Sequence, residues 1–186
     1  MPNQTKIAAA WLARDPIFLD TETTGLDHTA EVCDLAVVDA QGAVLLNTLV
    51  RTVRPIPPDA YAIHGIGNAD VAAAPTFAQV ADQLRAVLAG RLVVVYNADF
   101  DKQMLVQTHA LARVPAASLR RAEFVCAMRL YAAHYGAWNT YRRDYRWQTL
   151  EKAAAQCRLR WAGSAHRALA DAEMCRRVVR HMAGLK

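Results

Sequence analysis

The order of short apolar runs along the 186-residue chain constrains its fold more than any other feature. Runs with the length and composition of strands lie at residues 17–19, 31–39, 43–51, 92–95 and near 124–125. Between the second and third runs, residues 40–42 (AQG) suit a tight hairpin turn. The Pro-rich stretch at residues 54–59 cannot lie in the centre of a sheet. The sequence therefore predicts three consecutive strands, followed after a crossing by two more.

Segments in which apolar residues have helical spacing lie between the later strands and after them. The predicted helices cover residues 76–88, 100–111, 128–134, 148–157 and 167–182. Thr76 follows Pro75 and is suited to cap the first of them. Strands that alternate with helices in this way are typical of a mixed sheet with helices packed on its faces. We therefore predict an α/β fold of three layers, with residues 1–186 forming a single domain.

Composition excludes several classes of protein. Apolar residues make up 54% of the chain, enough for a substantial core without disulfides. No run approaches the ~18 apolar residues of a membrane span, and the N-terminal segment lacks the pattern of a signal peptide, so we expect a cytoplasmic protein. The cysteines form no CxxC pair and are expected to be reduced: Cys33, Cys126, Cys157 and Cys175. A net charge of +5 favours a polyanionic partner, although charge alone is weak support.

Two carboxylates stand at the end of the first predicted strand. Asp20 and Glu22 are two residues apart, so on a strand their side chains point the same way. Adjacent carboxylates repel unless hard cations neutralise them, and Mg²⁺ and Mn²⁺ prefer oxygen ligands. Gly25 then permits the chain to turn away. A metal site and a simple polar turn are both compatible with this segment alone.

Three segments, in order, resemble the motifs of a known family. DTETTGLD at residues 20–27 resembles the first motif of the DEDDh exonucleases, which include DNA polymerase III proofreading subunits and ribonuclease T. NADFD at residues 97–101 resembles the second motif, and HRALAD at residues 166–171 resembles the third. The matched span runs from about residue 16 to residue 182. The resemblance implies a ribonuclease H-like fold, in which a mixed five-stranded sheet is flanked by helices.

The same resemblance assigns catalytic roles residue by residue. The family's metal-binding carboxylates correspond to Asp20, Glu22, Asp101 and Asp171. Asp99 is not carried over, because the family's ligand follows Phe, and Asp99 suits a helix N-terminus instead. His166 corresponds to the general base, and a reference pKa near 6.5 lets it take a proton from water near neutral pH. The implied cofactors are two divalent cations, Mg²⁺ or Mn²⁺, about 3.5–4 Å apart, which flank the attacking and leaving oxygens.

Other residues are expected to contact the substrate or shape the site. By resemblance, Thr23 contacts the 3'-hydroxyl end and Leu26 wedges against the terminal base, although as plain residues they also suit a cap and a staple. His64, in a stretch similar to the family's IHGI, either reaches the substrate or orders its loop. Asn97 is expected to fix the loop of the second motif by backbone hydrogen bonds. Tyr96 departs from the family, which usually has His there, and this places specificity in doubt more than activity.

Residues 131–147 combine aromatic and basic side chains. Tyr131, Tyr135 and Trp138 fall at helical spacing. Arg142, Arg143 and Arg146 interleave with Tyr141 and Tyr145. Aromatic rings can stack on bases and arginines can hold phosphates, as in proteins that bind single strands. We favour core-facing positions for the three residues at helical spacing, and the arginines remain open between phosphate contacts and a solvated surface.

The predicted activity is that of a 3'→5' exonuclease. Family resemblance implies hydrolysis of single-stranded nucleic acid by a two-metal mechanism, with DNA favoured and 5'-mononucleotides released. One alternative is an exoribonuclease that trims RNA ends, and a more distant one is an inactive module that binds nucleic acid or a polymerase. An inactive module has no need of the complete set of carboxylates and His166. A DNA polymerase, or another replication or repair protein, is a candidate partner in proofreading or repair, and the oligomeric state is left open.

Overall fold

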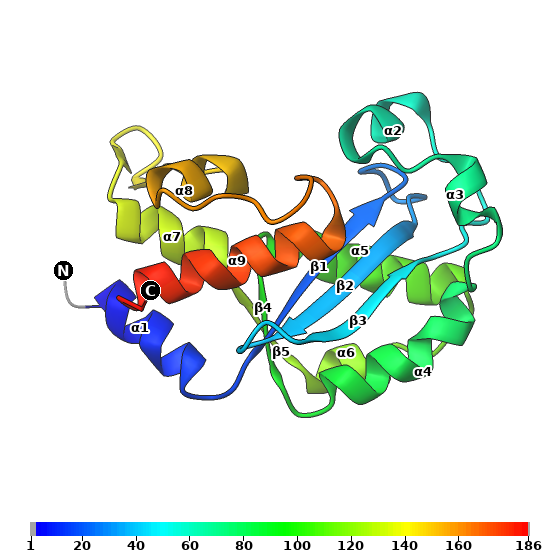
Figure 1. Ribbon diagram of the computed structural model, residues 1–186, viewed down its shortest axis with the longest axis horizontal. Helices are drawn as coiled ribbons and strands as arrows, with labels where there is room; N and C mark the ends of the chain where they lie inside the picture. The colour runs from blue at the N-terminus through cyan, green and yellow to red at the C-terminus, as the bar shows by residue number, and fades with distance from the viewer. Residues whose placement is uncertain (1–2, 186) are drawn as a thin grey trace.

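A mixed five-stranded sheet forms the centre of the molecule (Figure 1), as seen in a computed structural model that describes residues 3–185. The strands are β1 (Ile17–Thr23), β2 (Val32–Asp39), β3 (Val44–Leu49), β4 (Leu92–Val95) and β5 (Glu123–Cys126), arranged in the order β3-β2-β1-β4-β5. Antiparallel pairing joins β1 to β2 and β2 to β3, whereas β4 runs parallel to β1 and β5 parallel to β4. The predicted fold class and all five predicted strands are confirmed.

The turn between β2 and β3 is the tight hairpin that the sequence predicts. Asp39 Oδ1 accepts hydrogen bonds from the backbone N–H groups of Gln41 (2.9 Å) and Ala43 (2.8 Å). Gly42 adopts a φ of 94°, a left-handed conformation that favours glycine. This turn joins β2 to β3 in the register that pairs Asp34 with Leu49, and on its other side Asp34 pairs with Glu22 of β1.

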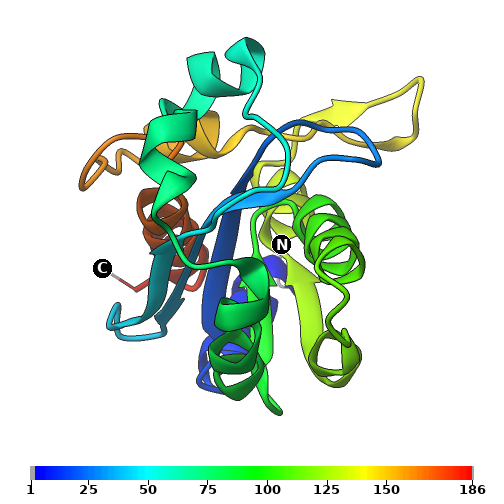
Figure 2. The same ribbon diagram turned by 90° about the vertical axis from the view of Figure 1, so that its right-hand side faces the viewer.

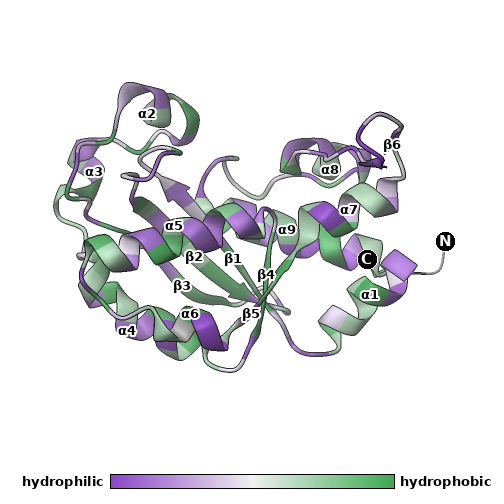
Figure 3. Cartoon of the chain, turned by 180° about the vertical axis from the view of Figure 1, so that it is seen from behind, coloured by the Kyte–Doolittle hydropathy of each residue, from purple (hydrophilic) through white to green (hydrophobic). Residues whose placement is uncertain are grey.

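Successive side chains of each strand point to opposite faces of the sheet, and each face packs against its own layer of helices (Figure 2). Phe18, Val38 and Val94 point to the layer of α1 (Asn3–Leu12), α7 (Ala127–Tyr135), α8 (Leu150–Gln156) and α9 (Ala168–Met182). Ile17 and Leu19 point to the opposite layer of α4 (Phe77–Leu88), α5 (Ala98–Leu111) and α6 (Ala117–Arg121). The strands are accordingly apolar on both faces, as their green colour in Figure 3 shows. The three-layer prediction is confirmed.

The predicted helices are present, with ends that shift by one or two residues. Thr76 is the N-cap of α4, where its backbone N–H donates to Gln79 Oε1 at 2.8 Å, so the predicted cap is confirmed. Four of the described helices were not predicted: α1, α6, α2 (Pro58–His64) and α3 (Asn68–Ala72). The last two are a turn or two long and lie in the crossing between β3 and β4, so they present too few residues for an apolar period.

The segment after α7 differs from its sequence interpretation. The helix ends at Tyr135, and Trp138 begins a two-stranded hairpin of β6 (Trp138–Asn139) and β7 (Asp144–Tyr145). Tyr131 is buried as expected, but Tyr135 is 49% exposed and Trp138 is 50% exposed, so the core-facing prediction was wrong for these two. Gly136, at a φ of 81°, ends the helix, so Trp138 lies outside the helical spacing on which its prediction depended.

Over residues 3–185, none of the helices combines the length and the apolar character needed to cross a membrane.

Candidate active site

The carboxyl end of β1 carries two acidic side chains to the face covered by α9. The alternation that buries Phe18 on this face continues to Asp20 and Glu22. Asp171 lies in the first turn of α9, opposite them. One carboxylate oxygen from each of these three acids lies within 4.8 Å of the other two. The end of β1 and the start of α9 therefore bring together three of the four predicted ligands.

The fourth predicted ligand, Asp101, approaches from the other side of β1. It lies in the first turns of α5, which follows β4, and it is only 4% exposed. Its Oδ1 accepts hydrogen bonds from the Thr21 backbone N–H (3.0 Å) and hydroxyl (2.8 Å). Asp99, by contrast, is exposed and forms an ion pair with Arg129 of α7. The structure thus places Asp101 against Thr21 of β1, the residue between Asp20 and Glu22, and points Asp99 toward Arg129 instead.

Burial makes the four carboxyl groups hard to ionise together. Loss of water raises the pKa of Asp20 well above its usual range, and repulsion from Asp101, Asp171 and Glu22 adds to the effect. Burial likewise raises the pKa of Glu22 to about 8, of Asp101 to about 7 and of Asp171 to about 6. The hydrogen bonds from Thr21 oppose the rise for Asp101 without cancelling it. An all-oxygen cluster of this charge fits hard divalent cations, which would offset the repulsion.

Metal-free protein is therefore expected to lose stability as the pH rises. A carboxyl with a higher pKa when folded binds more protons in the folded state, so the free energy of unfolding falls between the unfolded pKa near 4 and the folded value. For Asp171, Asp101 and Glu22 this window extends from about pH 4 to about pH 8. Each such group contributes a slope of about 1.4 kcal/mol per pH unit while it titrates.

Urea unfolding in EDTA at about pH 5 and about pH 8 measures this loss, and Mg²⁺ or Mn²⁺ added at the higher pH should restore stability. Stability that increases from the lower to the higher pH in EDTA would contradict the expected effect of the cluster.

His166 is bonded to Asp171 of the cluster and has a strained backbone conformation. Its φ is 59°, which costs a non-glycine residue about 1–3 kcal/mol and is typical of functional sites. The backbone N–H donates to Asp171 Oδ1 at 3.1 Å. The ring turns toward α8, where Nε2 lies 3.1 Å from Oε1 of Glu151, and both side chains are nearly half exposed. Glu151 was missed by the sequence interpretation, because nothing local connects it with a histidine fifteen residues later.

Asp34 is a fifth carboxylate beside the cluster, and it was also missed. It stands opposite Glu22 in the β1–β2 register and is 2% exposed. Its Oδ2 accepts from Arg167 Nε at 2.9 Å and from the Ala168 backbone N–H at 3.4 Å, while Oδ1 is buried without a hydrogen-bond partner. A protein cation therefore neutralises Asp34 and ties the start of α9 to β2. The available signal was a lone Asp within the apolar strand VCDLAVVD.

Removing Arg167 is expected to destabilise the protein, because Asp34 would remain buried without its cation. Arg167→Ala should lower the free energy of unfolding by about 2–3 kcal/mol, given that the arginine itself is half exposed. Asp34→Asn combined with Arg167→Ala should regain part of that loss. Urea unfolding of the wild type, Arg167→Ala, Asp34→Asn and the double variant measures the coupling between the two side chains. An Arg167→Ala protein as stable as the wild type would contradict the role of this pair.

A cleft of about 470 Å³ opens beside the cluster, between the turn after β1 and helix α2. Leu26, at 80% exposure, and Ile63, at 61%, stand at this cleft as apolar side chains open to solvent, and Phe100 also lines it. Thr23 is buried, and its hydroxyl donates to the Gly25 carbonyl oxygen at 2.7 Å. Leu26 was predicted from the sequence, whereas Ile63, which is exposed, and Phe100, which is partly buried, were missed because no spacing signal connects them with the cleft.

His64 is buried, and both its ring nitrogens are used inside the protein. Nδ1 accepts from the Ile66 backbone N–H at 3.0 Å, and Nε2 lies 3.3 Å from the Thr23 carbonyl oxygen, to which it can donate. Burial lowers the pKa of His64, which favours the neutral ring. Of the two interpretations left open by the sequence, these contacts favour loop ordering.

Tyr96 and Asn97 join the end of β4 to its surroundings. The Tyr96 hydroxyl donates to the Gln148 carbonyl oxygen at 2.9 Å and lies 3.2 Å from that of Thr149, the N-cap of α8. The Asn97 carbonyl oxygen accepts from the backbone N–H groups of Phe100 (3.0 Å) and Asp101 (3.2 Å). These bonds are accepted by the main chain of Asn97 at the start of α5, and the role expected of this residue stays a prediction. Tyr96 fixes α8 next to the second motif.

Sequence comparisons place this geometry among nucleases. The exonuclease family RNase T matches residues 17–179. The chain is 39% identical over 170 residues to the uncharacterized exonuclease CP81 of Escherichia phage 186, a match that covers 90% of this chain and 87% of the relative. It is also 30% identical over 95 residues to the DNA polymerase III subunit epsilon of Escherichia coli K12, covering 46% of this chain and 39% of that subunit.

Solved structures agree on the fold. Exonuclease X in complex with 5' overhanging duplex DNA superposes with a TM-score of 0.64 at 25% identity, covering 91% of this chain and 93% of the other. The nuclease domain of 3'hExo, a DEDDh family member bound to rAMP, superposes with a TM-score of 0.72, covering 92% of each chain at 16% identity. The second similarity concerns the fold alone.

Proposed function

Because the chain belongs to the DEDDh exonuclease family, we propose that it hydrolyses nucleotides from the 3' end of single-stranded nucleic acid and releases 5'-mononucleotides. The observation that carries this proposal is the cluster of half-buried carboxylates formed by Asp20, Glu22 and Asp171, with the buried Asp101 beside it. Such a cluster is unfavourable for stability unless cations bind it. A module that only bound nucleic acid would gain nothing from retaining it.

We propose that Asp20, Glu22, Asp101 and Asp171 hold two divalent cations, Mg²⁺ or Mn²⁺. When bound, such ions would make a water molecule nucleophilic near neutral pH and stabilise charge on the leaving 3'-oxygen. The proposed role of His166 is to take the proton of that water. In the neutral ring, donation from Nε2 to Glu151 leaves the lone pair on Nδ1, which can accept the proton.

The proposed site for the terminal nucleotide is the cleft beside the cluster. Leu26 and Ile63 offer apolar surfaces to a base, and the Thr23 hydroxyl lies close to the place proposed for the 3'-hydroxyl. An unpaired terminal base can lie between such side chains. A paired base would first have to break its stacking on neighbouring bases and its hydrogen bonds to the opposite strand. This favours single-stranded ends, and by family resemblance we favour DNA over RNA. We also propose a DNA polymerase as partner, and the similarity to polymerase III epsilon subunits supports this proposal.

End-labelled oligonucleotides test the direction of hydrolysis and the substrate. DNA and RNA of one sequence, labelled at either end, are incubated with the protein and Mg²⁺ or Mn²⁺. We expect a ladder that shortens gradually from 5'-labelled strands, immediate release of labelled mononucleotide from 3'-labelled strands, and faster hydrolysis of DNA. Release of 5'-terminal nucleotides first would refute the direction. Faster hydrolysis of RNA would favour the exoribonuclease alternative.

A further inference from the structure

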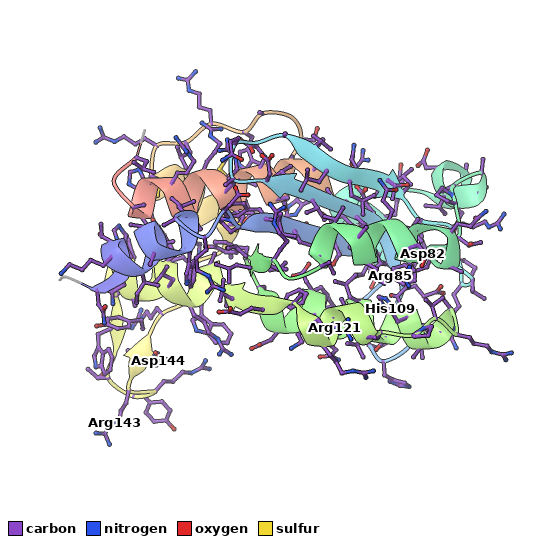
Figure 4. All side chains as sticks on the ribbon, turned by 90° about the horizontal axis from the view of Figure 1, so that it is seen from below. Asp82, Arg85, His109, Arg121, Arg143 and Asp144 are labelled. Carbon is purple, nitrogen blue, oxygen red and sulfur yellow. The ribbon has the colours of Figure 1, made fainter. Side chains whose placement is uncertain are left out.

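The hairpin formed by residues 138–147 is an ordered structure that the proposed hydrolysis does not use. Trp138 and Tyr145 face each other across its two strands, with ring centroids 5.1 Å apart in an edge-to-face arrangement. At the turn, Asn139 Oδ1 accepts from the backbone N–H groups of Tyr141 and Arg142, both at 3.1 Å. Figure 4 shows Arg143 and Asp144 projecting from the outer end of the hairpin. This edge-to-face pair and these turn bonds hold the hairpin in shape.

Two aromatic and three basic side chains of the hairpin are exposed and unpaired within the residues that the structure describes. Tyr141 is 94% exposed and Trp147 is 60% exposed, and within residues 3–185 neither ring contacts another ring or a cation. The guanidinium groups of Arg142, Arg143 and Arg146 form no hydrogen bond or ion pair with any part of the chain that the structure describes. A hollow of about 340 Å³ lies among Asn139, Arg142, Asp144, Tyr145, Arg146 and Trp147. Three free cations beside open aromatic rings make a surface suited to a polyanion with flat bases.

The base of the hairpin is anchored next to the active site. Tyr96, which precedes the second motif, bonds the carbonyl oxygens of Gln148 and Thr149 directly after the hairpin. Glu151, four residues after Trp147, contacts the ring of His166 at 3.1 Å. Because a chain spans at most about 3.6 Å per residue, the α-carbons of Trp147 and Glu151 are no more than about 14 Å apart. A few nucleotides cover that distance, since even in a duplex each strand rises about 3.4 Å per nucleotide.

We propose that this hairpin grips the single strand on the 5' side of the nucleotides bound at the active site. The phosphates contact Arg142, Arg143 and Arg146, and unpaired bases stack on Tyr141 and Trp147. A single strand is favoured over a duplex because the base faces of a duplex are already covered by neighbouring pairs. The positive charge of the hairpin also complements the strand outside the acidic cluster, where no divalent cation is required. This inference rests on the proposed exonuclease function.

Steady-state hydrolysis of a long and a short substrate tests the inference. We compare kcat/KM for a DNA strand of roughly 16 nucleotides with kcat/KM for a dinucleotide, which is too short to occupy both sites. In the Arg142→Ala, Arg143→Ala, Arg146→Ala triple variant, the ratio of long to short should fall about tenfold or more. The slope of log(kcat/KM) against log salt for the long strand should become shallower by about two, since each phosphate contact on a single strand contributes about 0.7.

Two further variants complete the experiment. Tyr141→Ala with Trp147→Ala should lower the same ratio about fivefold or more, because stacking is lost while the net charge is kept. The matched control is Arg113→Ala, Arg120→Ala, Arg121→Ala, which removes the same charge from exposed residues on and before α6 (Figure 4, where Arg121 is labelled). The control should keep the wild-type ratio.

Three outcomes would overturn the inference while leaving the proposed function standing. The hairpin variants could keep the same ratio as the control, or their kcat/KM could fall as much on the dinucleotide as on the long strand. The third outcome is a loss of kcat/KM on blunt duplex DNA equal to the loss on the single strand. A wild-type protein that hydrolyses neither substrate would instead refute the proposed function, and the inference with it.

Discussion

Replacing Asp101 with Asn is expected to reduce hydrolysis by more than about a hundredfold, the upper end of the loss typical for groups that only support a metal ligand. Asparagine keeps the size of the side chain and an oxygen that can accept from Thr21, so the fold should be retained. It removes one of the four negative charges proposed to hold the cations. The same change removes a buried negative charge that repels Asp20. Without metal, the variant should therefore be more stable than the wild type near pH 8.

The matched control for this experiment is Asp99→Asn. Asp99 lies two residues earlier on the same helix, is exposed, and pairs with Arg129. Loss of an exposed pair costs at most about 1 kcal/mol, and hydrolysis should remain close to that of the wild type. Initial rates on a single-stranded end and urea unfolding in EDTA measure both effects. An Asp101→Asn enzyme with a tenth or more of wild-type activity would exclude Asp101 from the proposed ligands.

Replacing His166 with Ala is expected to lower kcat by about 10²–10⁴, the contribution typical of a positioned general base. KM should change little, because the ring lies against Glu151 rather than in the cleft proposed for the nucleotide. The backbone N–H of residue 166, which donates to Asp171, is retained in the variant. His181→Ala, at the other end of α9, is the matched control.

Steady-state kinetics on a single-stranded end, with circular dichroism to verify the fold, measure the result. Unimpaired hydrolysis by a folded His166→Ala protein would remove the assignment of His166 as the base.

The strands and long helices were predictable because their signals are local. Residues 92–95 form four consecutive buried positions, and β4 has the predicted bounds. The spacing of Phe77, Val80, Leu84 and Leu88 predicts the buried face of α4. Helices α2 and α3 are too short to show a period, and the β6–β7 hairpin has only two residues in each strand. In those segments the conformation depends on contacts with residues that are distant in sequence, and such contacts cannot be predicted from the local pattern.

The site was predictable where a motif or an alternation carries it. Two residues apart on one strand, Asp20 and Glu22 had to share a face, and the structure brings them to Asp171. The preference for Asp101 over Asp99 came from family resemblance, whereas burial against Thr21 became visible only in the structure. Asp34 and Glu151 were missed, because each acts through a partner distant in sequence: Arg167 for the first and His166 for the second. For Asp34 the sequence offers only the signal of a lone Asp within an apolar strand.

Counting the Mn²⁺ ions bound per chain, by electron paramagnetic resonance with a nucleoside 5'-monophosphate present, tests the central claim most directly. The claim is that the four clustered carboxylates form a two-cation hydrolytic site. We predict two ions per wild-type chain, fewer in Asp101→Asn, and no hydrolysis in EDTA. A wild-type chain that binds no Mn²⁺ yet hydrolyses single-stranded ends in EDTA would contradict it.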